Sequence, residues 1–291
     1  MRERSLLDRL SVIERSLSAT HNKIAAFLLK SGHKAAFLTA AEIASNVGAS
    51  ESTVVRFARM LGFHGYPELQ DFLREGLLET LSPIDRLVGH DEIKDESKLI
   101  EHLAERETLN LRAALERIDG NALHNLVEAI CAAQTCYVVG LRSSRAPATL
   151  LGHYLTKIAP KVIVIESSDS MFEQLSWANK DDVLIAYSFP RYSKQTIDAI
   201  RIAKSCGART GAITDSQSAP AAQLSDYSLI APAISDFYGN SFVAAVAITN
   251  LLLASCVHAR PETVRQNLSR VEKVASYSER FVRLSDDPDR F

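Results

Sequence analysis

The chain of 291 residues is 46% hydrophobic and 23% charged with a net charge of −2, as expected for a globular protein with room for two domains. It has no run of about 18 apolar residues and no apolar signal-peptide core near residue 1, so we expect a cytoplasmic protein without a membrane partner. Its four cysteines lack metal-ligand spacing, so we expect reduced thiols and no metal site.

The charges are distributed unevenly along the chain. Residues 21–66 contain five Lys or Arg and two acids, a net charge of +3, so the remainder of the chain has a net charge of −5. A basic segment has the sign that the phosphate backbone of a nucleic acid requires. The bias is modest and supports nucleic-acid binding only together with a motif.

Helical periodicity runs through the first part of the chain. We expect one helix over residues 1–17 and a second, capped by Ser18 or Thr20, that ends at Gly32. Two helices of a compact motif and one closing helix follow. Together these segments predict a small all-α domain over residues 1–79.

The middle of this domain has the pattern of a helix-turn-helix unit. Thr39 and Glu42 form a capping box that begins a short helix, and Gly48 supplies the positive φ of a tight turn. Ser50 then caps a second helix, whose apolar residues fall on one face: Val54, Phe57, Ala58 and Leu61. An ordinary αα-hairpin is the alternative, but this order of caps and turn favours a DNA-binding unit.

Polar residues lie at the start of the second helix or off its apolar face. A recognition helix places such side chains in the major groove of DNA, where they contact bases or phosphates. The predicted DNA-binding residues are Ser50, Ser52, Thr53, Arg56 and Arg59. We expect double-stranded operator DNA as the partner, with two subunits reading a palindromic site.

A change of composition separates this domain from the rest of the chain. Residues 80–97 contain Pro83, Gly89 and a polar run, and we interpret them as a linker. A helix that ends at Gly120 follows, and then another over residues 121–133. Beyond them, short apolar runs alternate with helical segments.

Five apolar, β-rich runs mark the strands of a second domain over residues 98–285. Such strands joined by helical crossovers predict an α/β fold with a five-stranded parallel sheet flanked by helices. The expected strands are Cys136–Val139, Val162–Ile165, Val183–Tyr187, Arg209–Ile213 and Tyr227–Ala231. Helices over residues 241–258 and 261–281 close the chain.

Ligands of open parallel sheets bind beyond the carboxyl ends of the strands, and two strand ends here carry hydroxyls and cations. Each cluster opens a helix, whose free N–H groups favour an anion. The predicted ligand-binding residues are Gly140, Arg142, Ser143 and Ser144 after the first strand, and Ser188, Arg191, Tyr192 and Ser193 after the third. Ser144 and Ser193 could instead merely cap their helices, but two such clusters on one sheet favour anion binding.

The sequence supports an enzymatic site less strongly than it supports an anion-binding site. A dinucleotide site needs Gly-x-Gly-x-x-Gly after the first strand, but Arg142 occupies the second glycine position, and the Gly-x-Ser-x-Gly of a nucleophile elbow is absent. Glu173, His153, Asp169 and Asp215 are available for acid/base chemistry, but the sequence does not pair them. We therefore assign no catalytic residue and expect no cofactor.

Both halves of the chain resemble the RpiR family of bacterial transcription regulators, which join a helix-turn-helix domain to a sugar isomerase (SIS) domain. The resemblance is carried by residues 38–44 and 48–63 in the first half, and by residues 182–188 and 203–208 in the second. It implies a SIS fold that usually binds a phosphosugar, a homodimer or homotetramer, regulation of sugar metabolism, and no catalysis.

The resemblance also implies where the ligand binds, and the chain departs from the family pattern there. The family's Gly-x-Gly-x-Ser loop maps to Gly140, Arg142 and Ser144, and its Ser-x-Ser-Gly-x-Thr loop maps to Ser188, Pro190, Arg191 and Ser193. One glycine and the middle Ser-Gly pair are therefore replaced. Pro190 has no N–H to donate, whereas Arg191 could hold a phosphate or carboxylate with a bidentate fork.

These observations lead to the hypothesis of a DNA-binding transcription regulator whose operator affinity is controlled by an anionic sugar-derived metabolite, either a phosphosugar or a sugar acid. One alternative is a SIS-type phosphosugar isomerase with an accessory DNA-binding domain, which turnover of phosphosugars would reveal. Another is a ligand-independent DNA-binding protein, for which no metabolite would change operator affinity.

Overall fold

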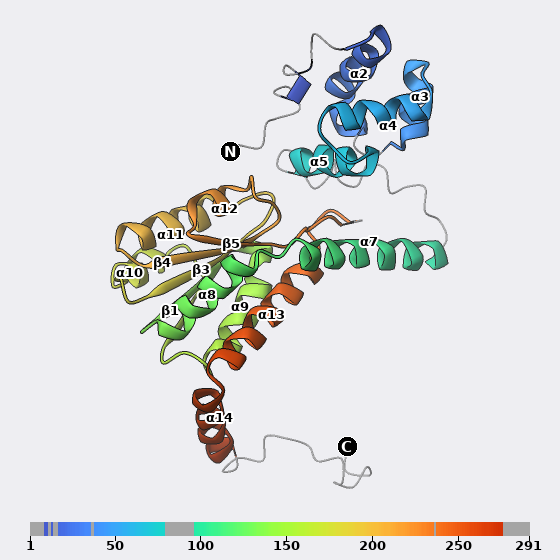
Figure 1. The fold of residues 1–291 in the computed structure, drawn as a ribbon. Coiled ribbons are helices and arrows are strands. Elements are labelled where there is room, and N and C mark those ends of the chain that lie inside the picture. Colours follow the sequence, from blue (N-terminus) through green and yellow to red (C-terminus); the bar gives the residue numbers. More distant parts are fainter. Residues whose placement is uncertain are drawn as a thin grey trace, which may run out of the picture. The chain divides into compact units, whose positions relative to one another are not determined.

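The computed structural model describes residues 9–10, 13, 17–35, 38–78, 96–235 and 237–275, which form two compact units (Figure 1). The first unit comprises the residues up to Thr108 together with 190–192 and 234–241, and the second comprises the remainder. Most of the expected helix over residues 1–17 and of the expected linker over residues 80–97 lies outside the described residues. Each unit is therefore described by itself.

The first unit is all-α, as predicted. Its described part contains α2 (Ala19–Ala35), α3 (Ala40–Val47), α4 (Glu51–Met60) and α5 (Tyr66–Leu78). Each of these helices gives a fully buried side chain to one core: Ile24, Ile43, Phe57 and Leu69. The prediction that α2 ends at Gly32 was wrong, because the helix continues for another three residues to Ala35.

Arg9 ties the start of the chain to this core. Its guanidinium lies 4.4 Å from the centre of the Phe63 ring and donates a hydrogen bond of 3.0 Å to the carbonyl of Leu61. A cation over an aromatic face is attracted by the negative face of the ring. The contact holds the turn that follows α4 in place.

The second unit is built on a five-stranded parallel sheet with the strand order β2-β1-β3-β4-β5. The strands are β1 (Cys136–Gly140), β2 (Val162–Ile165), β3 (Val183–Ser188), β4 (Arg209–Thr214) and β5 (Tyr227–Ile230). All five lie within one residue of their predicted bounds. Apolar residues point to both faces of the central strands, so helices must cover both faces.

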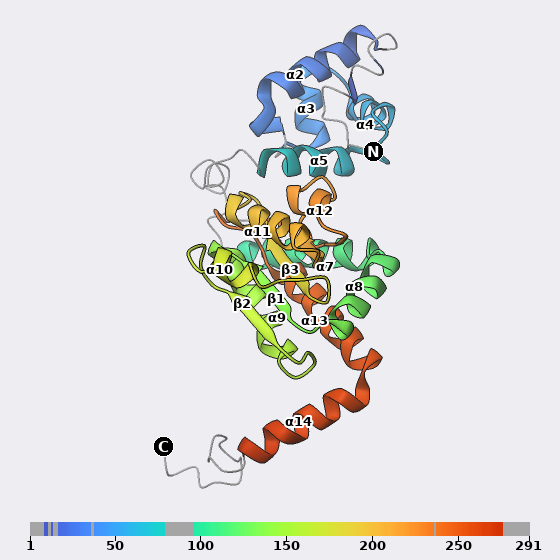
Figure 2. The same cartoon turned by 90° about the vertical axis from the view of Figure 1, so that its left-hand side faces the viewer.

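Helices cover the two faces of the sheet in two layers (Figures 1 and 2). One layer contains α8 (Gly120–Ala132), α9 (Arg145–Leu155) and α13 (Val243–Ala259). The other contains α10 (Met171–Leu175), α11 (Lys194–Ser205) and α12 (Pro220–Leu224). The long helix α7 (Glu96–Glu116) precedes α8, and α14 (Pro261–Ala275) follows α13.

Gly120 begins a helix instead of ending one. The carboxylate of Asp119 accepts hydrogen bonds of 2.9 and 3.1 Å from the backbone N–H groups of Asn121 and Ala122, so Asp119 is the N-cap of α8. Among the described helices, none is long and apolar enough to cross a membrane alone. Only α13 and α14 pass that test together, and they are bent by 103° at their junction.

The strand order sets the position of the candidate ligand-binding edge. Strand β1 lies between β2 and β3, so the connections that leave β1 and β3 run in opposite directions across the sheet. Gly140, the last residue of β1, pairs with Tyr187, the penultimate residue of β3. The loops after these two strands therefore start side by side at the switch point of the sheet.

Candidate functional site

The helix-turn-helix forms through the caps that the sequence predicts. The Thr39 hydroxyl accepts the N–H of Glu42 at 3.2 Å, and the Glu42 carboxylate accepts the N–H of Thr39 at 2.6 Å, which completes the capping box. The Glu42 carboxylate accepts hydrogen bonds from both the N–H and the hydroxyl of Thr39, and these two bonds lower its pKa. Gly48 has φ = 66°, and the Ser50 hydroxyl accepts the N–H of Thr53 at 3.3 Å to begin α4.

The predicted DNA-binding residues lie on one end and one side of α4. The side chains of Val54, Phe57 and Ala58 are buried, so the opposite side of the helix faces outward. Ser50, Ser52, Arg56 and Arg59 are exposed there and Thr53 is half-buried. The Ser50 hydroxyl lies 2.9 Å from that of Ser52 and 2.8 Å from that of Thr53, so the three hydroxyls form one polar cluster at the helix start.

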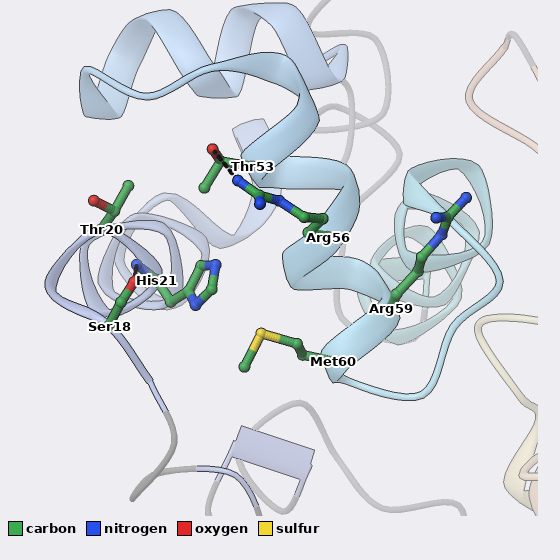
Figure 3. Close-up of a pocket in the computed structure, with 7 residues that line it drawn as sticks. All are labelled: Ser18, Thr20, His21, Thr53, Arg56, Arg59 and Met60. Atoms are coloured by element: carbon green, nitrogen blue, oxygen red, sulfur yellow. Dashed lines mark hydrogen bonds between the residues drawn. The ribbon is translucent and has the colours of Figure 1, made fainter.

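A hollow of about 440 Å³ lies between the start of α2 and the outer side of α4 (Figure 3). We call it the α2–α4 hollow. It is lined by Ser18, Thr20 and His21 from α2 and its cap, and by Thr53, Arg56, Arg59 and Met60 from α4. The sequence shows that Ser18 or Thr20 caps a helix, but it does not show that this helix begins beside α4. The three α2 residues were therefore missing from the predicted interface.

At the other candidate site, the loop after β1 depends on the backbone of Gly140. A Cβ at this position would lie 2.4 Å from the Ser144 carbonyl oxygen and 2.7 Å from the Cβ of Ala148. The start of α9 therefore rests directly on the end of β1, and only glycine fits. Arg142, which occupies the family's second glycine position, has φ = 56°, the left-handed conformation that glycine adopts without strain.

The serines at this edge do not cap their helices with their side chains, contrary to the alternative reading. Ser144 is buried and precedes α9, yet its hydroxyl makes no capping hydrogen bond. The Ser193 hydroxyl bonds to the Gln195 side chain at 2.9 Å instead of the backbone of α11. Ser188 is 2% exposed, and its hydroxyl has no hydrogen-bond partner among the described residues.

Strand β4 supports the same edge. Thr214 pairs with Ser188, and its hydroxyl donates a hydrogen bond of 2.5 Å to the Ser188 carbonyl. This bond leaves the Ser188 hydroxyl free and fixes the backbone that carries it. Thr196, in the first turn of α11, is 1% exposed and has an unpartnered hydroxyl among the described residues. No sequence pattern marked Thr196, because the hydroxyl of a helical threonine can bond to a carbonyl of the preceding turn.

The remaining predicted ligand residues differ in their placement. Arg142 and Ser143 are exposed in the short 3₁₀ turn Arg142–Ser144. Arg191 is exposed and Tyr192 is half-buried, and both belong to the first unit. In that unit the Asn240 side-chain amide donates a hydrogen bond to the Pro190 carbonyl.

The four residues available for acid/base chemistry do not gather at one place. Asp215 is buried at the end of β4, beside the hydroxyl edge. His153 lies in the last turn of α9, roughly 12 Å along the helix from its start. Glu173 and Asp169 are exposed near α10. Within the described ranges, no group of three or more His, Cys, Asp or Glu residues is placed to hold a metal ion.

Comparisons with known proteins agree with this two-part architecture. The model of the helix-turn-helix domain of the rpiR family matches residues 4–79, and the SIS domain model matches residues 129–257. The sugar isomerase domain of an RpiR transcription factor from Sphaerobacter thermophilus is 30% identical with a TM-score of 0.59, over 60% of this chain and 99% of that chain.

Two further similarities extend over most of the chain. An HTH-type transcriptional regulator from Haemophilus influenzae is 29% identical over 78% of this chain and 79% of its own length. The Vibrio vulnificus NanR protein, solved in complex with ManNAc-6P, is 23% identical with a TM-score of 0.59, over 94% of this chain and 98% of that chain.

A helix-turn-helix domain followed by a SIS domain defines a class of transcription regulators. The chain belongs to the RpiR family of that class.

Proposed function

We propose that the protein binds operator DNA through α4 and that an anionic sugar derivative, bound at the carboxyl ends of β1 and β3, controls its operator affinity. The observation that carries the second half of this proposal is the Ser188 hydroxyl, which is buried without a partner at the switch point of the sheet. A buried unpaired hydroxyl is unfavourable unless a ligand or water completes its hydrogen bonds. We assign DNA binding to residues 1–79 and ligand binding to residues 98–285.

The ligand class follows from the donors at this edge. Ser144 and Ser188 offer hydroxyls next to the start of α9, where helical N–H groups favour an anion. NanR, which shares the fold, was solved with ManNAc-6P, and this supports a phosphosugar. Pro190 and Arg142 replace residues of the usual phosphate loops, so a sugar acid is an equal candidate. The ligand acts by shifting the population between DNA-competent and DNA-incompetent arrangements.

The test is a panel of phosphosugars and sugar acids, screened by thermal shift and then added to operator DNA in a fluorescence-anisotropy titration. Ser188→Ala should retain DNA affinity and lose most of the metabolite response. Ser205→Ala is the matched control. Ser205 is the last residue of α11, at the end of the helix away from the hydroxyl edge, and its hydroxyl bonds to the Ile202 carbonyl. An undiminished response in Ser188→Ala would place the ligand elsewhere.

The same protein preparation distinguishes the alternatives. If it interconverted phosphosugars, the isomerase hypothesis would replace ours, with Asp215, which is buried directly after β4, as one candidate acid/base residue. If no metabolite changed either melting temperature or operator affinity, the protein would be a ligand-independent DNA binder. We also propose a homodimer or homotetramer, because a palindromic operator requires at least two copies of α4.

A further inference from the structure

The polar side chains that line the α2–α4 hollow have the chemistry of an anion site. No carboxylate is among the seven lining residues, and all of them except Met60 carry a group that can donate a hydrogen bond. Two of the seven are arginines. A lining that is rich in donors and has no carboxylate suits a ligand that offers only acceptors, such as a phosphate.

The side chains of the hollow do not all point the same way (Figure 3). Arg56 extends along the side of α4 that faces α2, and its Nη2 lies 3.4 Å from the Thr53 hydroxyl. Arg59 turns away from α2, and its Nε donates a hydrogen bond of 3.3 Å to the His64 carbonyl. Both arginines therefore line the hollow, but only Arg56 lies on its α2 side.

The α2 side of the hollow is held in place before any ligand arrives. The Ser18 hydroxyl accepts the N–H of His21 at 3.2 Å, which fixes the first turn of α2. The His21 ring packs 5.8 Å from the ring of Phe57, a fully buried core residue. Its Nδ1 is buried and has no hydrogen-bond partner among the described residues. Thr20, whose hydroxyl is not needed for the cap, lies in the same first turn of α2 and also lines the hollow.

We infer that the α2–α4 hollow takes one backbone phosphate of duplex DNA, held jointly by Thr20 and His21 from α2 and by Thr53 and Arg56 from α4. The inference rests on the proposed DNA binding and sharpens it. Arg56 contacts the backbone and not a base, so it sets the position of α4 on the duplex. The exposed Ser52, one turn earlier on α4, is then left for the base edges.

The test measures affinity for two duplexes of unrelated sequence by fluorescence anisotropy over a range of salt concentrations. Thr20→Val and Arg56→Gln should each weaken binding about tenfold, equally for both duplexes. Arg56→Gln should also reduce the slope of log affinity against log salt by about 0.9, the value for one phosphate contact. Thr20→Ser, which keeps the hydroxyl, should bind like the unmodified protein and so excludes misfolding as the cause.

A double-mutant cycle identifies the shared phosphate. Thr20→Val should cause little further loss of DNA affinity in the Arg56→Gln variant, because both substitutions remove the same contact. In the Arg59→Gln variant the two losses of affinity should multiply, because Arg59 lies outside the α2 side of the hollow. Independent effects of Thr20 and Arg56, or a loss confined to one duplex sequence, would overturn the inference. Failure of the unmodified protein to bind either duplex at low salt would instead refute the proposed DNA binding itself.

Discussion

Gly140→Ala is the sharpest test of the loop that begins the ligand-binding edge. The new Cβ would lie 2.4 Å from the Ser144 carbonyl oxygen and 2.9 Å from its carbon, and both atoms belong to the backbone. A backbone contact cannot be relieved by a rotamer change, so the start of α9 must move away from β1. We expect destabilisation near the upper end of the range for overpacking, about 3 kcal/mol, and hence a melting temperature lower by about 6–12 °C.

Gly120→Ala provides the matched control. A Cβ at Gly120, in the first turn of α8, would meet nothing within 4 Å. Alanine restricts the unfolded chain more than glycine does, so this variant should be more stable by about 0.4–1 kcal/mol. Calorimetry on both variants, with and without ligand, measures the two effects. Equal melting temperatures for Gly140→Ala and the unmodified protein would show that α9 does not rest on β1 in solution.

Three further predictions concern charge and conformation in the second unit. Arg142→Gly relieves about 1–2 kcal/mol of strain in the left-handed backbone, but it also increases the entropy of the unfolded chain. Calorimetry should therefore show a net stabilisation of up to about 1 kcal/mol. Destabilisation would contradict the φ of 56° at Arg142. A hydrogen bond from the Cys256 thiol lowers the pKa of Cys131 to about 7. The alkylation rate of Cys131 should therefore rise with pH around 7, and Cys256→Ala should move the midpoint of this rise to higher pH. Burial raises the pKa of Asp226, but hydrogen bonds from Lys204 and from the hydroxyl and N–H of Thr210 hold it below its usual value. Asp226→Asn should destabilise the protein at neutral pH, and urea titrations should show the difference shrinking as pH falls from about 3.9 through the lowered pKa of Asp226.

Local signals predicted the fold well because each acts over a few residues. The Thr39–Glu42 capping box, the positive φ of Gly48 and the apolar face of α4 need only near neighbours, and all are present. The strands were found because buried parallel strands are apolar throughout. Gly120 was misread, since a glycine between two helices can end the first or begin the second, and only the side chain of Asp119 decides.

The candidate sites required distant information that the sequence does not contain. The pairing of Gly140 with Tyr187 brings the two hydroxyl loops together, and it follows from a strand order that no local pattern encodes. The hollow beside α4 depends in the same way on where α2 begins. The absence of caps from Ser144 and Ser193 is a matter of side-chain geometry, since both serines stand at ideal capping positions in the sequence.

Replacements at the family's loop positions change the donor set of the candidate ligand-binding edge. Pro190 removes a backbone N–H, and Arg142 keeps the left-handed backbone of the glycine it replaces while adding a guanidinium. The left-handed backbone costs a residue other than glycine about 1–2 kcal/mol. Strain of this kind persists where the side chain is useful. A guanidinium recognises carboxylate and phosphate by the same fork, so the proposed ligand is an anion whichever of the two groups it carries.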